Sequence, residues 1–254
     1  MNEQAGKNLP AFFITEAAPC PYLEGKLERK LFTHLLGENA DMLNFALSQS
    51  GFRRSQTIAY RPACDNCNAC QSSRVIVDKF QPSKSFRRII NRNKDLTSEV
   101  LAASATREQY ELLRLYLDQR HEDSGMASMT SLDYIEMVEK SAIDTHLVEY
   151  RDAHGTLMAC LLADRMPDGL SMVYSFFNPL EKGRSFGSYI ILDQIARAKE
   201  QDFPHVYLGY LIDKCQKMAY KKRFQPLQCL GKDGWADYRE QSDILRIERF
   251  DHEK

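Results

Sequence analysis

The chain has 254 residues, of which 43% are hydrophobic and 27% charged, with a formal net charge of -1 at pH 7. This balance is that of an ordinary globular protein with one large or two small domains, and the sequence contains neither an internal repeat nor a low-complexity tract. No apolar run approaches the 18 or more residues of a membrane span, and the polar start MNEQAGKNLP lacks the apolar region of a secretory signal. We therefore expect a cytoplasmic protein whose seven cysteines serve metal binding, catalysis or burial rather than disulfides.

The first part of the chain is predicted to be rich in loops. Apolar residues at helical spacing predict helices over 27–36 and 42–52, the second ending near Gly51. The run VIVDKF at 75–80 predicts a strand, which Pro82 ends.

The second part alternates between helix and strand. REQYELLRLYLDQRHE at 107–122 predicts an amphipathic helix with Thr106 as N-cap and Gln109 three residues later. The turn Pro167–Gly169 predicts a hairpin, and the tail from Asp237 is expected to be peripheral. The remaining predicted elements are strands over 145–150, 156–166, 170–177 and 205–210, a glycine turn and helix within 184–201, and a basic helix over 214–224.

This order of elements resembles the GNAT acyltransferase fold. The resemblance includes the run RSFGS beginning at Arg184, close to the R-x-x-G-x-G/A phosphate loop of that fold. Backbone N–H groups at a glycine turn that opens a helix form an anion site, although a plain turn before a helix needs the same small residues. Ser188 and Tyr189 follow Gly187, so the last small residue of the acetyl-CoA pattern is missing. We predict an α+β protein with a cysteine-containing α+β subdomain over 1–103 and a GNAT-like transferase domain, a mixed sheet flanked by helices, over 104–254.

Three cysteines lie within the run CDNCNACQSSR, at C-x2-C-x2-C spacing, and a fourth stands far upstream. Four thiols suit structural zinc or an iron–sulfur cluster, or they pack a small subdomain as reduced side chains. The compact ferredoxin run needs a cysteine at position 74, which is arginine here, so a fourth ligand has to come from a distance. The four cysteines are Cys20, Cys64, Cys67 and Cys70; Cys160, Cys215 and Cys229 are expected to be buried.

Two segments concentrate positive charge. Residues 74–94 contain seven Lys or Arg against one acid, Asp78, which gives a net +6. The run from Lys214 to Phe224 has five cations and no acid. Such runs either face water as helix surfaces or contact the phosphates of a nucleic acid, here RNA, because no major-groove reading module is present. The predicted RNA contacts are Lys84, Arg87, Arg88, Arg92, Lys221, Lys222 and Arg223.

Taken together, the motifs resemble the aminoacyl-tRNA–protein transferases of the N-degron pathway, the arginyltransferase-type family, and in particular its bacterial, leucine-transferring branch. The similarity extends from Leu9 to Trp235. It implies transfer of leucine from leucyl-tRNA to the α-amino group of proteins that begin with Asp or Glu, with no organic cofactor, and it implies Cys20 as the fourth cysteine ligand. In chain order the motifs are PCPYL around Cys20, GFRRS at 51–55, YRP at 60–62, the cluster at 64–70, Arg74, SKSFRR at 83–88 and YLGYLIDKCQKMAYK at 207–221.

This reaction needs few protein groups. A free α-amino group, with a pKa of ~8, needs no strong base, so positioning and donors to the developing oxyanion supply the rate. The acceptor's carboxylate needs a cation, for which Arg74 is the first candidate. His121 is the histidine expected to line the cleft. The other candidates are Tyr174, Tyr207 and Tyr210 as oxyanion donors, Asp213 to orient the ammonium, and Arg61, Lys217 and Tyr220 as further substrate contacts.

Three alternatives remain open at this stage. An arginyl donor is hardly separated from leucine by the residues, although Met172, Phe176 and Met218 offer an apolar pocket. A GNAT acetyltransferase would bind acetyl-CoA and need no tRNA. A non-enzymatic RNA-binding module would bind tRNA without transfer.

Overall fold

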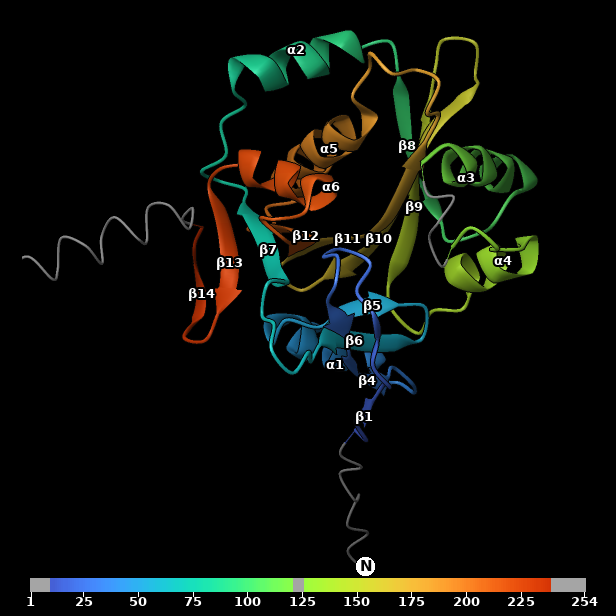
Figure 1. The fold of residues 1–254 in the computed structure, drawn as a ribbon. Coiled ribbons are helices and arrows are strands. Elements are labelled where there is room, and N and C mark those ends of the chain that lie inside the picture. Colours follow the sequence, from blue (N-terminus) through green and yellow to red (C-terminus); the bar gives the residue numbers. More distant parts are fainter. Residues whose placement is uncertain (1–9, 121–125, 239–254) are drawn as a thin grey trace, which may run out of the picture.

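The computed structural model describes residues 10–120 and 126–238 and centres on an eight-stranded mixed sheet (Figure 1). Strands β11 and β12 form the parallel pair, and the other neighbouring pairs in this sheet are antiparallel. In spatial order the strands are β14 (Gly234–Asp237), β13 (Leu227–Gly231), β7 (Gln71–Ile76), β12 (His205–Leu211), β11 (Gly169–Phe177), β10 (Leu157–Met166), β9 (Thr145–Arg151) and β8 (Thr97–Ala102).

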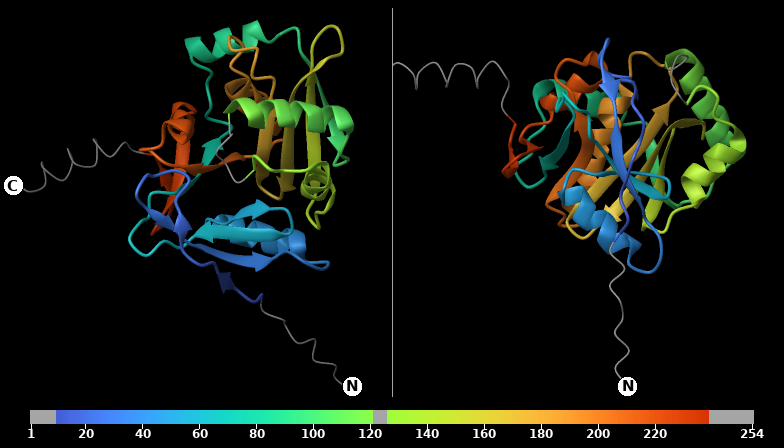
Figure 2. Two further views of the ribbon diagram at one scale, coloured as in Figure 1. Left: turned by 45° about the vertical axis from the view of Figure 1, so that its right-hand side comes forward. Right: turned by 60° about the horizontal axis from the view of Figure 1, so that its bottom comes forward.

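Helices cover both faces of this sheet (Figure 2). Helices α3 (Arg107–Arg120) and α4 (Ser131–Glu139) pack on one face, and α2 (Lys84–Arg92) and α5 (Phe186–Glu200) pack on the other. Successive residues of β10 alternate between the two cores, Cys160 on the α3 side and Leu161 on the α5 side, as the period of two in a strand requires. The result is the predicted α+β architecture, with a large mixed sheet flanked by helices.

A smaller sheet lies beneath the large one, with α1 (Ala40–Gln49) packed against it (Figure 1). The link to the large sheet is a buried ion pair: Arg54 Nη2 lies 2.6 Å from Asp164 Oδ1, and these side chains are 2% and 1% exposed. In order its strands are β1 (Phe13–Ile14), β4 (Lys30–His34), β6 (Ile58–Pro62) and β5 (Arg53–Ser55), and β2 (Ala18–Pro19) pairs separately with β3 (Leu27–Glu28).

Most predicted elements are confirmed. The helix predicted over 42–52 is present as α1, which begins and ends slightly earlier, at Ala40 and Gln49. The β9–β10–β11 meander forms as predicted, and α3 begins with the predicted capping box. In that box Thr106 N donates to Gln109 Oε1 at 2.9 Å, and Gln109 N donates to Thr106 Oγ1 at 3.2 Å.

Two helix predictions are wrong. Residues 27–36 form β3 and β4, because the buried Thr33 and Leu35 alternate with exposed neighbours in the manner of a strand. The basic helix over 214–224 is only α6 (Gln216–Ala219) followed by the 3-10 turn η1 (Tyr220–Arg223). Helix α4 and strands β1, β2, β5, β6, β8, β13 and β14 were not predicted. The strand predicted over 75–80 is misplaced, because β7 begins at Gln71 and ends at Ile76.

The division into domains at residues 103 and 104 stays a prediction. Strands β7 and β8 come before this boundary in the sequence, yet they belong to the large sheet. Within 10–120 and 126–238, no helix is both long and apolar enough to cross a bilayer. His121 and the tail beyond residue 238 lie outside the described residues.

Candidate active site

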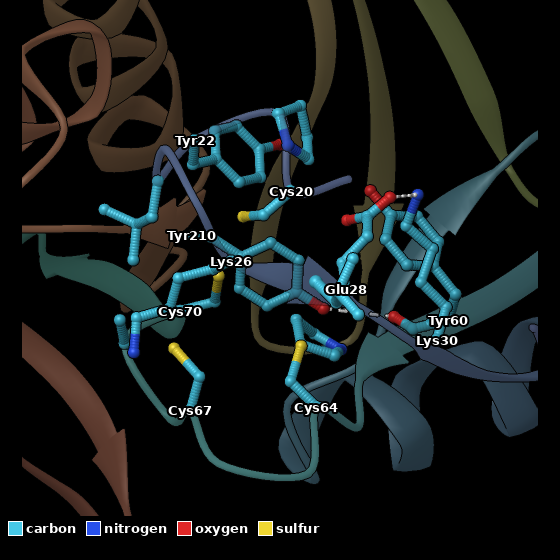
Figure 3. A pocket seen from close by; sticks show the side chains of 15 residues that line it. Cys20, Tyr22, Lys26, Glu28, Lys30, Tyr60, Cys64, Cys67, Cys70 and Tyr210 are labelled. Atoms are coloured by element: carbon cyan, nitrogen blue, oxygen red, sulfur yellow. Dashed lines mark hydrogen bonds and ion pairs between the residues drawn. The ribbon is translucent and has the colours of Figure 1, made fainter. Parts of the chain in front are cut away.

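The four cysteines of the predicted site line one pocket (Figure 3). Cys20 follows β2, and the other three lie on the loop between β6 and β7. All four are half-buried free thiols. Burial is the largest cause, ahead of the neighbouring cysteines, that raises the pKa of Cys70 to about 12. The folded chain therefore brings the four thiols to one pocket, and their role as metal ligands stays a prediction.

The chemistry of this donor set fits a soft metal ion or an iron–sulfur cluster. No three His, Cys, Asp or Glu side chains of the described ranges lie close enough to one another to form a ligand shell as they stand. Ligand thiols have to lose their protons, and the raised pKa of Cys70 opposes this without a cation. The pocket thus provides the donor types in one place.

Tyrosines form the side of the pocket toward the large sheet. The hydroxyl of Tyr210, on β12, lies 3.1 Å from the carbonyl oxygens of both Gly51 and Tyr60. Burial raises the pKa of Tyr210 and of Tyr22 well above the ordinary value. Tyr210 therefore stays protonated and ties β12 to the smaller sheet.

The parallel pair of the large sheet, β11 and β12, separates beyond its first residues. Gly169, Leu170 and Ser171 of β11 pair with His205, Val206 and Tyr207 of β12, and the register ends there. Past this point the two strands run on without pairing, so the backbone groups on their facing edges need other partners. Ligands of α/β sheets bind at such carboxyl-end crevices.

A side chain from the smaller sheet enters this gap on the β11 side. Arg53 Nη2, on β5, donates to the carbonyl oxygen of Met172 at 2.6 Å. The same guanidinium lies against Gly209 of β12, where an added Cβ would be 2.5 Å from Nη1. Gly209 also has φ +84°, so glycine is required there for two reasons.

A buried lysine occupies the β12 side of the gap. Lys221 Nζ donates to the carbonyl oxygen of Tyr210 at 2.8 Å, and Lys221 is 8% exposed. Burial, followed by the charge of Arg53, lowers its pKa to about 7. The predicted surface position of Lys221 among the RNA contacts is therefore wrong, because η1 turns this side chain inward.

Arg74, the first candidate for the acceptor's carboxylate, lies in a network at the other end of β12. Its Nε donates to Gln228 at 3.0 Å, its Nη1 donates to Tyr207 Oη at 3.1 Å, and its guanidinium lies 4.3 Å from the Trp235 ring centroid. Asp168, 3.8 Å away, already balances its charge. A second carboxylate would be repelled by Asp168, so the structure does not favour Arg74 for this role.

The other predicted site residues are not brought together. Tyr174 packs with the α3 core and Tyr207 belongs to the Arg74 network, so Tyr210 alone of the three lines the pocket. Asp213 accepts a hydrogen bond from Tyr238 at 2.7 Å. Arg61 stacks on Phe52, Lys217 is exposed on α6, and Tyr220 is half-buried against Phe224.

Five of the remaining predicted RNA contacts form one surface. Lys84, Arg87, Arg88 and Arg92 are exposed along α2. Arg223 of η1 joins them, since Nη2 lies 3.3 Å from Ser85 Oγ and the guanidinium lies 5.1 Å from the Phe86 ring centroid. We call Lys84, Arg87, Arg88, Arg92 and Arg223 the basic surface; Lys222, also predicted as an RNA contact, is half-buried on η1.

Two family models match the chain. The N-terminal model of arginine-tRNA-protein transferase matches residues 18–88, and the C-terminal model matches residues 108–231. The chain belongs to the arginine-tRNA-protein transferase family. Family membership agrees with the resemblance on which the motifs converged.

Individual relatives support the same family. The aspartate/glutamate leucyltransferase of Parvibaculum lavamentivorans is 56% identical over 92% of this chain and 98% of its own length. That of Nitrobacter hamburgensis is 52% identical over 91% and 93%, respectively. L-PGS from Bacillus licheniformis, a solved structure, has a TM-score of 0.51 at 13% identity over 90% of this chain and 87% of its own, a similarity of fold.

Sequence reasoning missed the two cations of the gap as a pair. Arg53 was part of the family motif GFRRS but received no role, and Lys221 was assigned to the surface. Two adjacent arginines on a strand point to opposite faces, which was a signal that Arg53 and Arg54 differ. Arg53 and Lys221 lie near each other because η1 turns Lys221 inward, and sequence periodicity did not predict η1.

Proposed function

We propose that this member of the family transfers leucine from leucyl-tRNA to the α-amino group of proteins that begin with Asp or Glu, and so marks them for degradation. The observation that carries the proposal is the match to relatives named aspartate/glutamate leucyltransferase, at 50–56% identity over more than nine tenths of both chains. Because charged tRNA would be the donor, the proposal includes a cytoplasmic location for the reaction.

The chemistry is direct aminolysis of an ester. The α-amino nitrogen attacks the leucyl carbonyl carbon, a C–N bond forms, and the carbonyl oxygen becomes negative for a moment. The bond from that carbon to the ribose oxygen then breaks, and the proton lost by the amine ends on that oxygen. The ester is already activated, so the protein needs neither ATP nor an organic cofactor. Its task is to position the reactants and stabilise the oxyanion.

The basic surface is the natural place for the tRNA. It joins α2 to η1, and η1 carries Lys221 into the strand gap. Phosphate contacts hold the register of a nucleic acid without reading sequence. A tRNA bound there can direct its charged 3′ end toward the gap between β11 and β12.

The choice of leucine over arginine rests on the relatives. Of the apolar residues proposed for the leucine side chain, Phe176 is buried in the α3 core, whereas Met172 and Met218 are half-buried. Met172 also lies at the gap, because its carbonyl accepts from Arg53.

The cysteine pocket completes the proposal. Cys20, Cys64, Cys67 and Cys70 would hold zinc or an iron–sulfur cluster, which would fasten the loop between β6 and β7 to the chain around Cys20. The visible absorption spectrum and metal content of anaerobically purified protein separate a cluster from zinc. A protein with neither, under these conditions, would contradict the metal proposal.

The experiment for the transfer itself mixes the protein with tRNA charged with labelled leucine or, separately, arginine. Acceptor peptides begin with Asp, Glu, Arg or Ala. Label from leucine on the Asp and Glu peptides is expected. Label from arginine would change the donor, and no label from either would overturn the transferase proposal.

A further inference from the structure

The gap between β11 and β12 holds one basic side chain on each wall. Arg53 binds a carbonyl of β11 and Lys221 binds a carbonyl of β12. Both are fixed by backbone acceptors before any substrate arrives. The two walls come from segments far apart in sequence, the smaller sheet and η1, which meet at this point.

No acid within residues 10–120 and 126–238 pairs with either of these two basic side chains. Among the residues that the structure describes, neither Arg53 nor Lys221 forms an ion pair, and Met172 O is the one hydrogen-bond acceptor of Arg53. A guanidinium has five N–H donors, so most of them stay available. Burial first, and the charge of Arg53 second, lower the pKa of Lys221, so a proton on this amine is costly here. An anion in the gap would offset the electrostatic cost of positive charge on both Arg53 and Lys221.

We infer that Arg53 is a catalytic residue that donates hydrogen bonds to the carbonyl oxygen of the leucyl ester as that oxygen becomes negative, and that Lys221 is a positioning residue that fixes the opposite wall. This inference rests on the proposed function, since it names the group that stabilises the charge in aminolysis of the ester. It replaces the three tyrosines predicted as donors: the hydroxyl of Tyr210 faces Gly51 and Tyr60, and that of Tyr207 donates to Asp168.

A transient oxyanion fits the gap better than the acceptor's carboxylate does. A carboxylate is charged before it binds and would have to be dehydrated to enter between two strands. The ester is neutral in the ground state and gains charge only during the attack. Donors fixed in advance then favour the transition state over the bound substrate, which is the condition for raising kcat.

The test compares single-turnover transfer rates, with enzyme in excess over labelled leucyl-tRNA and a saturating peptide that begins with Asp. Removal of one preorganised oxyanion donor costs about a hundredfold or more in rate, so we expect that loss for Arg53→Ala. The tRNA affinity and the KM for peptide should stay within about twofold of wild type. Added guanidinium ion should restore part of the rate to Arg53→Ala and none to wild type.

Arg53→Lys is the second variant, in case the alanine variant does not fold. It keeps the charge but has no planar fork to reach both Met172 O and the ester, so a rate loss of about tenfold is expected. Lys221→Met should lower the rate and gain nothing from guanidinium. The control is Arg107→Ala, whose side chain is 90% exposed on α3 and whose rate should not change. Thermal melting confirms that each variant is folded.

An unchanged rate in both Arg53 variants would overturn the inference. So would a loss confined to the KM of the Asp peptide, because that pattern identifies Arg53 as the partner of the acceptor's carboxylate. Failure of the wild-type protein to transfer leucine is a different result and overturns the proposed function instead.

Discussion

The two ends of β12 show two ways in which a protein holds an arginine. Near its start, Arg74 is fixed by Tyr207, Gln228 and Trp235 and is balanced by Asp168. Near its end, Arg53 has one backbone acceptor and a buried lysine beside it. A hydrogen-bonded, neutralised cation stabilises a fold, whereas an unbalanced one, held in place at a cost, is available to a ligand. Perturbed and uncompensated charge of the second kind marks functional sites.

The largest expected effect on stability comes from breaking a buried ion pair, in which each charge is balanced by its partner. Arg54→Met removes one partner of the buried pair with Asp164, which is also held by Thr145 at 2.8 Å. Loss of one member of a buried ion pair costs about 3–5 kcal/mol of unfolding free energy. Urea unfolding measures this loss of unfolding free energy. The neighbouring Arg53→Met, in the unbalanced region, should lose much less stability and much more activity; equal losses in stability would contradict the comparison.

Asp168→Asn tests the Arg74 network with a smaller change. Asp168 Oδ2 accepts from Tyr207 at 2.7 Å and lies 3.2 Å from His205 Nδ1. Although burial opposes ionisation, the hydrogen bonds from His205 and Tyr207 and the charge of Arg74 hold the pKa of Asp168 below its ordinary value. Its stabilising contribution is therefore present at neutral pH and is lost as pH falls through the lowered pKa.

We expect Asp168→Asn to cost about 1–3 kcal/mol at neutral pH, with a transfer rate per folded molecule close to that of wild type. Urea unfolding at neutral and acidic pH checks both the size and the direction, since the difference from wild type should shrink in acid. A large fall in transfer rate at full stability would place the Arg74 network in the active site.

Lys221→Met tests the region near the end of β12, where Arg53 has no acidic partner among the described residues. Burial lowers the pKa of Lys221 from 10.5 to about 7. Between these two values the unfolded chain binds the proton that the folded protein lacks, so wild-type stability should rise with pH by at most about 1.4 kcal/mol per unit from this group. The difference in unfolding free energy between wild type and Lys221→Met, measured from pH 6 to 9, should follow this direction. A constant difference would mean that Lys221 keeps its charge in the folded state.

The smallest effect is expected on the basic surface, where water already compensates each charge. Replacing Arg87 and Arg88 with alanine should weaken tRNA binding about equally for all charged tRNAs and lower the log–log salt slope by about one for each lost phosphate contact. Filter binding at several salt concentrations measures both. Arg107→Ala, on α3, is the control; unchanged binding in the double variant would move the tRNA elsewhere.

The sequence predicted much of the architecture because periodicity is local information. The β9–β10–β11 meander, α1 and α3 were all read correctly, the last with its capping box. The helix predicted over 27–36 is wrong because five apolar residues within this short segment fit either period. Only the pairing of β4 with β1 and β6 selects the strand. The basic run after Asp213 failed for a related reason, since burial of Lys221 and Phe224 stopped the helix after one turn.

The sequence by itself determined the family, through the order of its motifs, and determined that four thiols and a basic segment accompany a transferase domain. These are statements about which residues exist and in what order. Only the tertiary structure decided that Arg53 and Arg54, identical neighbours in one strand, have opposite tasks: one enters an unpaired gap, and the other meets a buried aspartate. The physical reason is that the charge balance of a side chain depends on partners more than a hundred residues away, and the fold alone brings these partners within reach.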